Sequence, residues 1–251
     1  MIPVLELKNI HKSYRRKNST VQAVKGVEFK IFPGECLGLV GESGCGKSTL
    51  AKLITASESA DRGEIYIKGN KILEGGKNSH KMICETVQMV FQVPVTSFNP
   101  RQRLGNSIME GMINRGIGKK EARDRAGEYL EICGLAKEYA ERYPHQVSGG
   151  ECQRASFARA IAVNPSLLIC DEATSALDVT IQAQIIKLIG KLKKENNTAY
   201  LFISHDIAVV QEICDRMIIM HQGQIVEEGR PDEIISNPKN EYTKILIDSC
   251  L

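Results

Sequence analysis

The segment Gly41-Glu42-Ser43-Gly44-Cys45-Gly46-Lys47-Ser48-Thr49 decides how the rest of this chain is interpreted. An apolar run over residues 36–40 precedes it, and a helical pattern over residues 50–55 follows it. Glycines let a backbone wrap so that successive N–H groups point at anionic oxygens, and a helix start adds its positive dipole end. Lys47 would reach the β- and γ-phosphates, and the Ser48 hydroxyl would ligate Mg²⁺. The order of strand, glycine loop and helix therefore predicts a nucleotide site.

The length, charge and cysteine content of the chain indicate what class of protein it is. The chain has 251 residues, of which 42% are hydrophobic, so it has room for a large α/β domain with its own core. A net charge of +3 is too small to indicate a nucleic-acid partner. No apolar run approaches the ~18 residues that span a bilayer, and the N-terminus lacks the pattern of a signal peptide. The 8 cysteines include no C-x-x-C pair and lie mostly in apolar runs, which indicates buried reduced thiols in a cytoplasmic protein.

The order of the predicted elements favours a largely parallel sheet. Strand-like patterns come first, a polar loop is expected over residues 75–79, and the pattern turns helical between residues 96 and 153. From residue 167 onward, short apolar runs alternate with a helical pattern, which implies right-handed crossovers between parallel strands. We expect strands near residues 5–8, 23–31, 36–40, 64–68, 87–91, 167–170, 200–203 and 217–220.

Two further motifs are candidates for chemistry. Asp171 and Glu172 close an apolar strand, and ligands bind at the carboxyl ends of parallel strands. Asp171 is suited to hold Mg²⁺, and Glu172 to orient and deprotonate an attacking water. Ser148-Gly149-Gly150 opens a helix whose N-terminus could face an anion. The alternatives are a pair of solvated loop acids and an ordinary helix start.

The residues around this second helix start carry a family resemblance. Val147-Ser148-Gly149-Gly150-Glu151-Cys152-Gln153-Arg154 resembles the signature sequence of ATP-binding cassette ATPases, and the likeness runs from about residue 5 to residue 229. The resemblance implies that Tyr14 stacks on adenine and that Gln92 bridges Mg²⁺ and a membrane subunit. It also implies that the segment ending at Asp178 connects two ATPase subunits and that His205 contacts the γ-phosphate. A strand-end aromatic, a surface amide and a core histidine are the alternative interpretations of Tyr14, Gln92 and His205.

The same resemblance implies the organisation of the chain. We expect a single ATPase domain over residues 1–251, α/β in class, with a P-loop NTPase (RecA-like) core and an N-terminal antiparallel β part. The core would comprise residues 1–95 and 156–235, an inserted helical subdomain residues 96–155, and a short tail residues 236–251. The predicted catalytic residues are Glu172 and His205, and the predicted Mg²⁺ ligands are Ser48, Gln92 and Asp171. The predicted ATP-binding residues are Tyr14, Gly41, Glu42, Ser43, Gly44, Cys45, Gly46, Lys47, Ser48, Thr49, Gln92, Ser148, Gly149, Gly150 and Asp178.

In this family two ATPases dock head to tail, and the signature of one closes over the ATP held by the other. We therefore expect a second, identical or related ATPase subunit, transmembrane permease subunits and an extracytoplasmic solute-binding protein. The chain would lie on the cytoplasmic face of the membrane, without a nucleic-acid partner. The alternatives are a soluble cassette ATPase that acts on ribosomes or DNA, a nucleotide-sensing regulator, and an export ATPase.

A finer resemblance is to the ATPases of peptide and nickel importers, carried by residues 96–101, 143–146 and 237–243. Longer peptide-importing members continue with a cysteine-bearing tail, which favours the nickel or metal-chelate type over the oligopeptide type for this chain. The signature departs from the family at Val147 and Glu151, where leucine and glutamine are usual. The Glu151 carboxylate would come near the partner's γ-phosphate. Cys45 is interpreted as a small residue that fits the loop.

Overall fold

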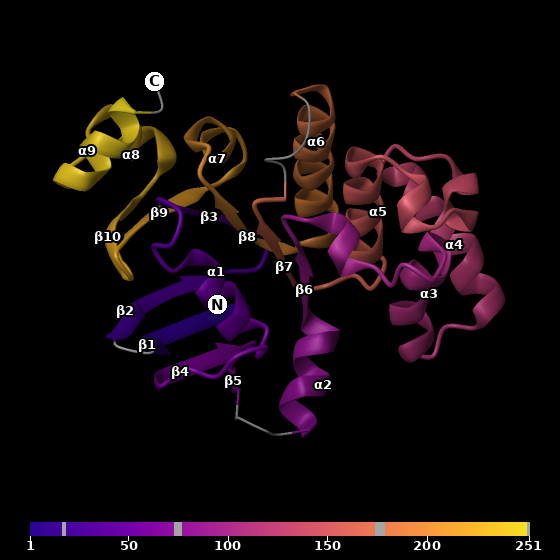
Figure 1. The fold of residues 1–251 in the computed structure, drawn as a ribbon, viewed down its shortest axis with the longest axis horizontal. Helices are drawn as coiled ribbons and strands as arrows, with labels where there is room; N and C mark the ends of the chain where they lie inside the picture. Colours follow the sequence, from indigo (N-terminus) through magenta and orange to yellow (C-terminus); the bar gives the residue numbers. More distant parts are fainter. Residues whose placement is uncertain (17–18, 73–76, 174–178, 250–251) are drawn as a thin grey trace.

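The computed structural model describes residues 1–16, 19–72, 77–173 and 179–249, and these residues form two β-sheets (Figure 1). The smaller sheet is antiparallel and has the strand order β2-β1-β4-β5. Its strands are β1 (Leu5–Arg16), β2 (Ser19–Ile31), β4 (Arg62–Ile67) and β5 (Asn70–Lys71). This sheet is the predicted antiparallel part at the N-terminus.

The larger sheet has the order β10-β9-β3-β8-β7-β6, and its pairings are parallel except that between β9 and β10. Every residue of β3 and β8 is buried, because a parallel sheet covered on both faces needs near-continuous apolar strands. The α/β fold predicted from the sequence is thereby confirmed. The strands are β3 (Cys36–Val40), β6 (Val87–Val90), β7 (Leu167–Asp171), β8 (Ala199–Ser204), β9 (Arg216–His221) and β10 (Gln224–Gly229).

Strand β8 divides its side chains between two hydrophobic cores. Tyr200 and Phe202 belong to the core that includes α5 (Gly149–Ile161), whereas Leu201 and Ile203 belong to the core that includes α1 (Lys47–Ile54) and the antiparallel sheet. This division follows from the alternation of side chains along a strand. The sheet is therefore held on both faces, and the end of β8 has a fixed position.

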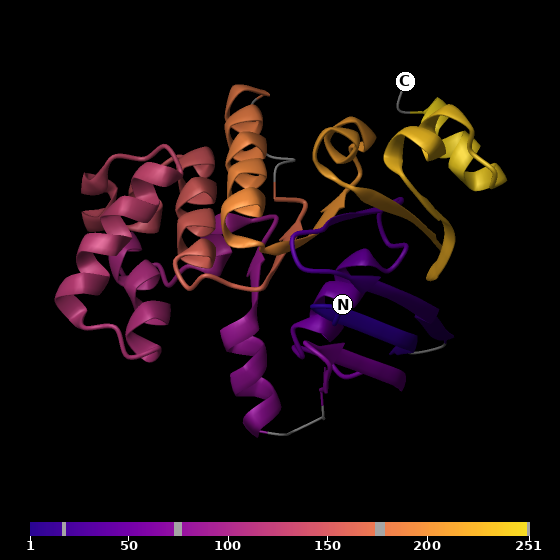
Figure 2. The same ribbon diagram turned by 180° about the vertical axis from the view of Figure 1, so that it is seen from behind.

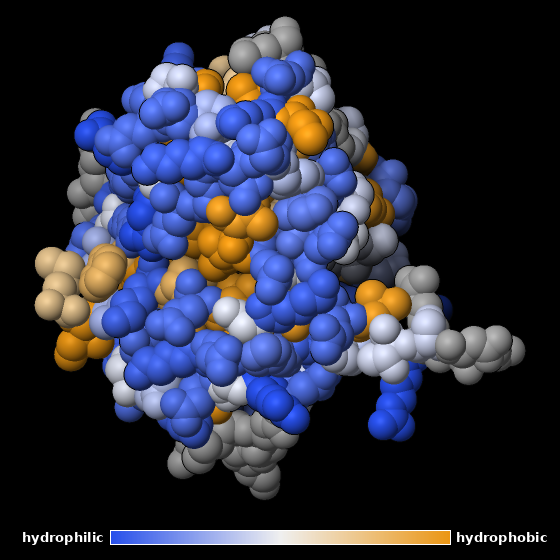
Figure 3. Space-filling model, turned by 90° about the vertical axis from the view of Figure 1, so that its left-hand side faces the viewer, coloured by the Kyte–Doolittle hydropathy of each residue, from blue (hydrophilic) through white to orange (hydrophobic). Residues whose placement is uncertain are grey.

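The helices lie around the larger sheet and at both ends of the molecule (Figures 1 and 2). Helices α3 (Leu104–Asn114), α4 (Lys119–Ile132) and α5 gather at one end, whereas α8 (Pro231–Ser236) and α9 (Glu241–Asp248) lie at the other. Figure 3 looks onto the latter end, where hydrophilic side chains surround a central hydrophobic area. The remaining helices are α2 (Lys77–Thr86), α6 (Val179–Asn196), α7 (Ile207–Ile213), η1 (Pro94–Ser97), η2 (Lys137–Glu141) and η3 (Pro144–Gln146).

Some expectations need correction or qualification. The loop expected over residues 75–79 is wrong from Lys77 onward, because Ser79, Ile83 and Thr86 form a buried stripe along α2. Helix α5 continues across residue 155, and the predicted division of the chain at residues 95 and 155 stays a prediction.

The described cysteines form no disulfide bonds. Of the cysteines that the structure describes, Cys84 is exposed and the others are buried, and all are free. Within the described ranges, no helix is long and apolar enough to cross a bilayer.

Candidate active site

The loop between β3 and α1 is shaped by a glycine that no other residue replaces without a clash. Gly46 has a φ of +114°, and a Cβ added there would lie 2.2 Å from the backbone oxygen of Ala23. Helix α1 begins directly after it and has no acidic side chain in its first turn. The N–H groups of this turn therefore present an uncompensated positive helix end to the loop, which suits an anion.

The Lys47 side chain is buried inside the loop. Its Nζ donates to the backbone oxygen of Gly41 at 2.6 Å and to that of Glu42 at 2.8 Å. The carbonyl dipoles replace part of the hydration that the ammonium loses on burial. The loop thus holds a positive charge beside the helix N-terminus.

A hollow of about 280 Å³ joins this loop to residues from two other strands. The end of β6 contributes Gln92 and the end of β7 contributes Glu172, as expected for parallel strands whose carboxyl ends meet at one edge. Residues predicted separately are thereby brought to one place. The lining comprises Ala23, Ser43, Gly44, Gly46, Lys47, Ser48, Thr49, Gln92 and Glu172.

The two predicted carboxylates have different surroundings. The Ser48 hydroxyl donates to Asp171 Oδ1 at 3.5 Å, and burial raises the pKa of Asp171 in spite of that hydrogen bond. Glu172 has a φ of +47°, a backbone conformation that costs a non-glycine residue free energy. Its N–H donates to the Ile203 oxygen at 2.9 Å, so the neighbouring strand holds the residue there.

Polar side chains that follow β6 and β8 meet at the Glu172 carboxylate, which follows β7. Gln92 Nε2 donates to Glu172 Oε2 at 2.6 Å, and His205 Nδ1 lies 3.8 Å from the same oxygen. The Glu172 side chain is 17% exposed and that of His205 is 59% exposed. The carboxylate is therefore shielded but reachable, as a base that must meet a water molecule has to be.

The residues around Ser48 fit a magnesium ion. Ser48 and Asp171 offer hard oxygen ligands next to the phosphate loop, and the Gln92 side chain offers an amide oxygen close by. Within the described residues, no cluster of three or more His, Cys, Asp or Glu side chains could hold a metal by itself. Mg²⁺ typically binds through one or two carboxylates together with substrate phosphates.

Tyr14 lies on β1 and is tied to the segment after α1. Its hydroxyl donates to Glu58, the Thr49 side chain is a further hydrogen-bond partner, and Lys12 Nζ lies 5.6 Å from its ring centre. Burial and Glu58 raise the pKa of Tyr14. The ring is therefore placed beside the loop's Thr49, although it does not line the hollow.

The predicted signature lies at the start of α5, outside this hollow. Ser148 is the N-cap of the helix, and its Oγ accepts from the Glu151 N–H at 3.3 Å. Glu151 Oε2 accepts from the Ser148 N–H at 2.7 Å and from its hydroxyl at 2.9 Å, while Oε1 accepts from Tyr139. The Tyr139 and Ser148 donors lower the pKa of Glu151 to about 2. Its carboxylate is thus directed at its own helix cap. The predicted residue Asp178 lies outside the described residues.

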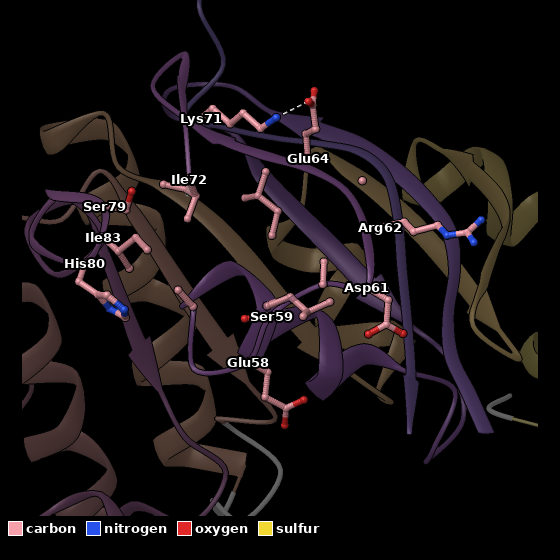
Figure 4. Close-up of a pocket in the computed structure, with 15 residues that line it drawn as sticks. Glu58, Ser59, Asp61, Arg62, Glu64, Lys71, Ile72, Ser79, His80 and Ile83 are labelled. Carbon is pink, nitrogen blue, oxygen red and sulfur yellow. Dashed lines mark hydrogen bonds and ion pairs between the residues drawn. The ribbon is translucent and has the colours of Figure 1, made fainter. Parts of the chain in front are cut away.

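A second hollow, of about 360 Å³, lies between α1, β4 and α2 (Figure 4). Its three acidic residues and Lys71 are paired within the chain. Glu58 accepts from Tyr14, the Ser13 N–H donates to Asp61, and Lys71 pairs with Glu64. Paired groups leave little free charge for a ligand, so the phosphate loop remains the candidate site.

Sequence reasoning missed several contacts of the site. Glu42 donates its N–H to the hydroxyl of Tyr242, a residue 200 positions away. Gln153, buried in α5, donates to the backbone oxygen of Ala173 at 2.8 Å and so links α5 to the segment after β7. Partners this distant in sequence leave no local pattern. The Ser148-x-x-Glu151 spacing, by contrast, is that of a capping box and was visible in the sequence.

Known proteins resemble this chain in sequence and in fold. The family model described as ABC transporter matches residues 24–175. The oligopeptide transport ATP-binding protein OppF of Bacillus subtilis (strain 168) is 44% identical over 251 residues, which cover 98% of this chain and 82% of that protein. The dipeptide transport ATP-binding protein DppF of Escherichia coli (strain K12) is 39% identical, with 98% of this chain and 76% of that protein covered.

A third curated relative is much longer than this chain, and two solved structures are also similar. The glutathione import ATP-binding protein GsiA of Pectobacterium atrosepticum is 42% identical, but this chain covers 41% of it. The dimeric structure of the ATP-binding cassette MJ0796 with ADP and Pi has a TM-score of 0.85 at 30% identity, with 90% of this chain and 98% of that chain covered. The structure of cbiO1 from Clostridium perfringens, part of the transporter complex cbiONQ, has a TM-score of 0.82 at 25% identity, with 94% and 92% covered.

Proposed function

This chain belongs to the ABC transporter family and is one of its ATP hydrolases, and from that premise we propose that it energises the import of small peptides through separate membrane subunits. The observation that carries the proposal is the 44% identity with an oligopeptide transport ATP-binding protein over 98% of this chain. A second relative, at 39%, is a dipeptide transport protein. Both are named for transport of the same class of solute.

Peptides replace nickel as the proposed solute class. The preference for a nickel or metal-chelate importer depended on the length of the C-terminal tail alone. The curated relatives described above are named for oligopeptides, dipeptides and glutathione, which is itself a small peptide. They support a peptide, and a nickel chelate is kept as an outcome of the test.

We propose that the hollow beside the phosphate loop is the ATP site. The ATP phosphates would lie against the N–H groups of residues 43–49, with Lys47 as their cation and the adenine near Tyr14. Ser48, Asp171 and Gln92 would hold Mg²⁺, which neutralises charge on the phosphate oxygens.

Glu172 is the proposed base of the hydrolysis. It would accept a proton from water as the water oxygen attacks the γ-phosphorus and the bond to the bridging oxygen of ADP breaks. The hydrogen bond from Gln92 fixes the position of the carboxylate. His205, at the end of β8, would donate to the γ-phosphate.

The placement of the signature supports a dimer in which each site has two parts. Ser148, Gly149 and Gly150 lie outside the hollow of their own chain, so we propose that they close over ATP held by a second ATPase subunit. The similar MJ0796 cassette is dimeric in its structure with ADP and Pi. Asp178 would lie at the same interface.

The remaining partners follow from the family. We propose that residues 96–155 contact a permease subunit on the cytoplasmic face of the membrane, and that an extracytoplasmic binding protein delivers the peptide. Residues that end or follow β6 support this contact surface, because Phe91, Val93 and Val95 are each more than 40% exposed.

Reconstitution would test the function. The chain is purified together with a peptide permease and a solute-binding protein from the same genome, and the complex is placed in lipid vesicles. We expect ATPase activity and uptake to rise with di- or oligopeptides and to disappear in Glu172→Gln. Stimulation by a nickel chelate alone would contradict the peptide proposal. Co-purification with ribosomes or DNA instead of the permease would contradict import.

A further inference from the structure

The C-terminal helix α9 contacts the first residues of the phosphate loop. Tyr242, in its first turn, accepts a hydrogen bond at its hydroxyl oxygen from the Glu42 N–H at 3.1 Å. Glu42 is the second residue of the loop that ends β3. The contact thus joins the end of the described chain to the site near its start.

The hydrogen bond acts on a peptide group that Lys47 also contacts. The Glu42 N–H and the Gly41 C=O belong to one planar peptide unit, so they point in opposite directions and turn together. Lys47 Nζ donates to that Gly41 oxygen at 2.6 Å. Tyr242 therefore holds one side of the peptide whose other side positions the ammonium.

Tyr242 is itself held from several directions. Its ring stacks on His221, the last residue of β9, with ring centres 3.8 Å apart and planes inclined by 29°. The Asn240 side chain caps α9 by accepting from the Tyr242 N–H at 2.9 Å. The phenol oxygen is therefore fixed relative to the larger sheet, because both its ring and its backbone are anchored.

The turn before α9 is anchored as well. The Glu227 carboxylate accepts from the Lys239 N–H at 2.9 Å and from the Asn240 N–H at 3.1 Å. Leu246 and Ile247, further along α9, are buried in the core shared with α7 and β9. Because α9 is anchored in this way, it can fix the position of the loop that it contacts.

We infer that Tyr242 is a positioning residue for ATP binding, which fixes the peptide between Gly41 and Glu42 and thereby the position of Lys47. The inference rests on the proposed ATP site. Without the hydroxyl, this peptide gains freedom to rotate, and ATP has to order it on binding. We therefore expect nucleotide affinity to decrease and the rate of hydrolysis to stay similar, because the groups proposed to carry out the hydrolysis are unchanged.

The variant Tyr242→Phe tests this inference, because it keeps the ring on His221 and removes only the hydroxyl. We expect the full chain to bind MgATP roughly three- to ten-fold more weakly, the effect of one hydrogen bond. In the assembled complex KM for ATP rises by the same factor while kcat changes less than about two-fold. The matched control is Tyr66→Phe, which loses a hydroxyl bonded to Glu64 in the antiparallel sheet and should bind ATP normally.

A second variant removes the same hydrogen bond from the other side. Glu42→Pro has no N–H to donate, so it should weaken ATP binding, and adding Tyr242→Phe to it should cause no further loss. Additive losses would overturn the inference. So would an unchanged dissociation constant in Tyr242→Phe.

Hydrogen exchange in the unaltered chain gives a measurement that needs no variant. Protection of the Glu42 amide supports the contact, whereas exchange as fast as in an exposed loop overturns it. The variant Lys47→Ala distinguishes a failure of the proposed ATP site from a failure of the proposed role of Tyr242. If it leaves ATP binding intact, the proposed site is wrong. If it abolishes binding while Tyr242→Phe has no effect, only the role of Tyr242 is wrong.

Discussion

The phosphate loop and the signature each lead into the N-terminus of an α-helix, yet their polar groups are used differently. Around the loop, the ends of β3, β6 and β7 direct side chains into one hollow. At α5, the Ser148 hydroxyl and N–H are bonded to Glu151 of the same helix. The first region offers a hollow that can hold a ligand within the chain, whereas the second is complete as a helix cap. The polar groups of the signature can contact only a ligand that another molecule holds.

The largest effect should come from the proposed base, Glu172. Glu172→Gln keeps the shape of the side chain but cannot accept a proton from water. We expect the ATPase rate of the assembled complex to fall by about 10²–10⁴-fold, the contribution of a general base, with ATP binding retained. Turnover and equilibrium binding are measured on the same preparation. A rate within a few-fold of the unaltered protein would show that another group takes the proton.

The signature should matter only when a second subunit is present. We expect Ser148→Ala to lower the ATPase rate of the complex by about 100-fold and to leave ATP binding by the isolated chain unchanged. Because the serine is also a helix cap, Gly149→Ala is the companion variant. A Cβ at Gly149 meets open space in its own chain, so the fold should tolerate it while closure over a partner's ATP is hindered. Full activity in Gly149→Ala would argue against close approach of the partner.

The variants Gly46→Ala and Gly44→Ala form a matched pair that tests ATP binding by the loop. Gly46→Ala places a Cβ 2.2 Å from the Ala23 oxygen, whereas Gly44→Ala, at a φ of +83°, meets nothing within 4 Å. Both changes cost about 1–2 kcal/mol of backbone strain, but only the first also forces the loop away from β2. We expect at least a ten-fold loss of ATP affinity in Gly46→Ala and a smaller loss in Gly44→Ala. Titration with MgATP and thermal unfolding measure both effects, and equal losses would contradict the geometry.

The smallest effect should come from the unusual signature residue. Glu151→Gln preserves a capping box, so the ATPase rate of the complex should stay the same or rise. A severe loss would contradict this interpretation of the signature.

The same variant tests the pH dependence of stability. The pKa of Glu151 is about 2, against an ordinary value of 4.5. Its stabilising contribution is therefore present above about pH 4.5 and is lost as the pH falls towards about 2. Acid unfolding should show a weaker dependence in this range for Glu151→Gln than for the unaltered chain.

Features of the fold and of the site that depend on residues close together in the chain could be predicted from the sequence. The phosphate loop, the acids that end β7 and the alternation of strands and helices are local patterns, so their placement at one sheet edge could be inferred. Helix α2 was missed because its buried stripe is short and begins with the polar Ser79. The Tyr139 bond to Glu151 and the Tyr242 bond to Glu42 depend on how distant elements pack, which no periodicity records.

The alternation along β8 has a consequence for how the molecule loses its structure. Tyr200 and Phe202 pack in one core, and Leu201 and Ile203 pack in the other. Loss of packing in either core therefore also removes contacts that hold β8, the strand that both cores share. Melting should then be a single cooperative transition in which spectroscopic probes on opposite faces of the sheet report the same midpoint. The strand that helps to position the candidate site thus also couples the unfolding of the two cores.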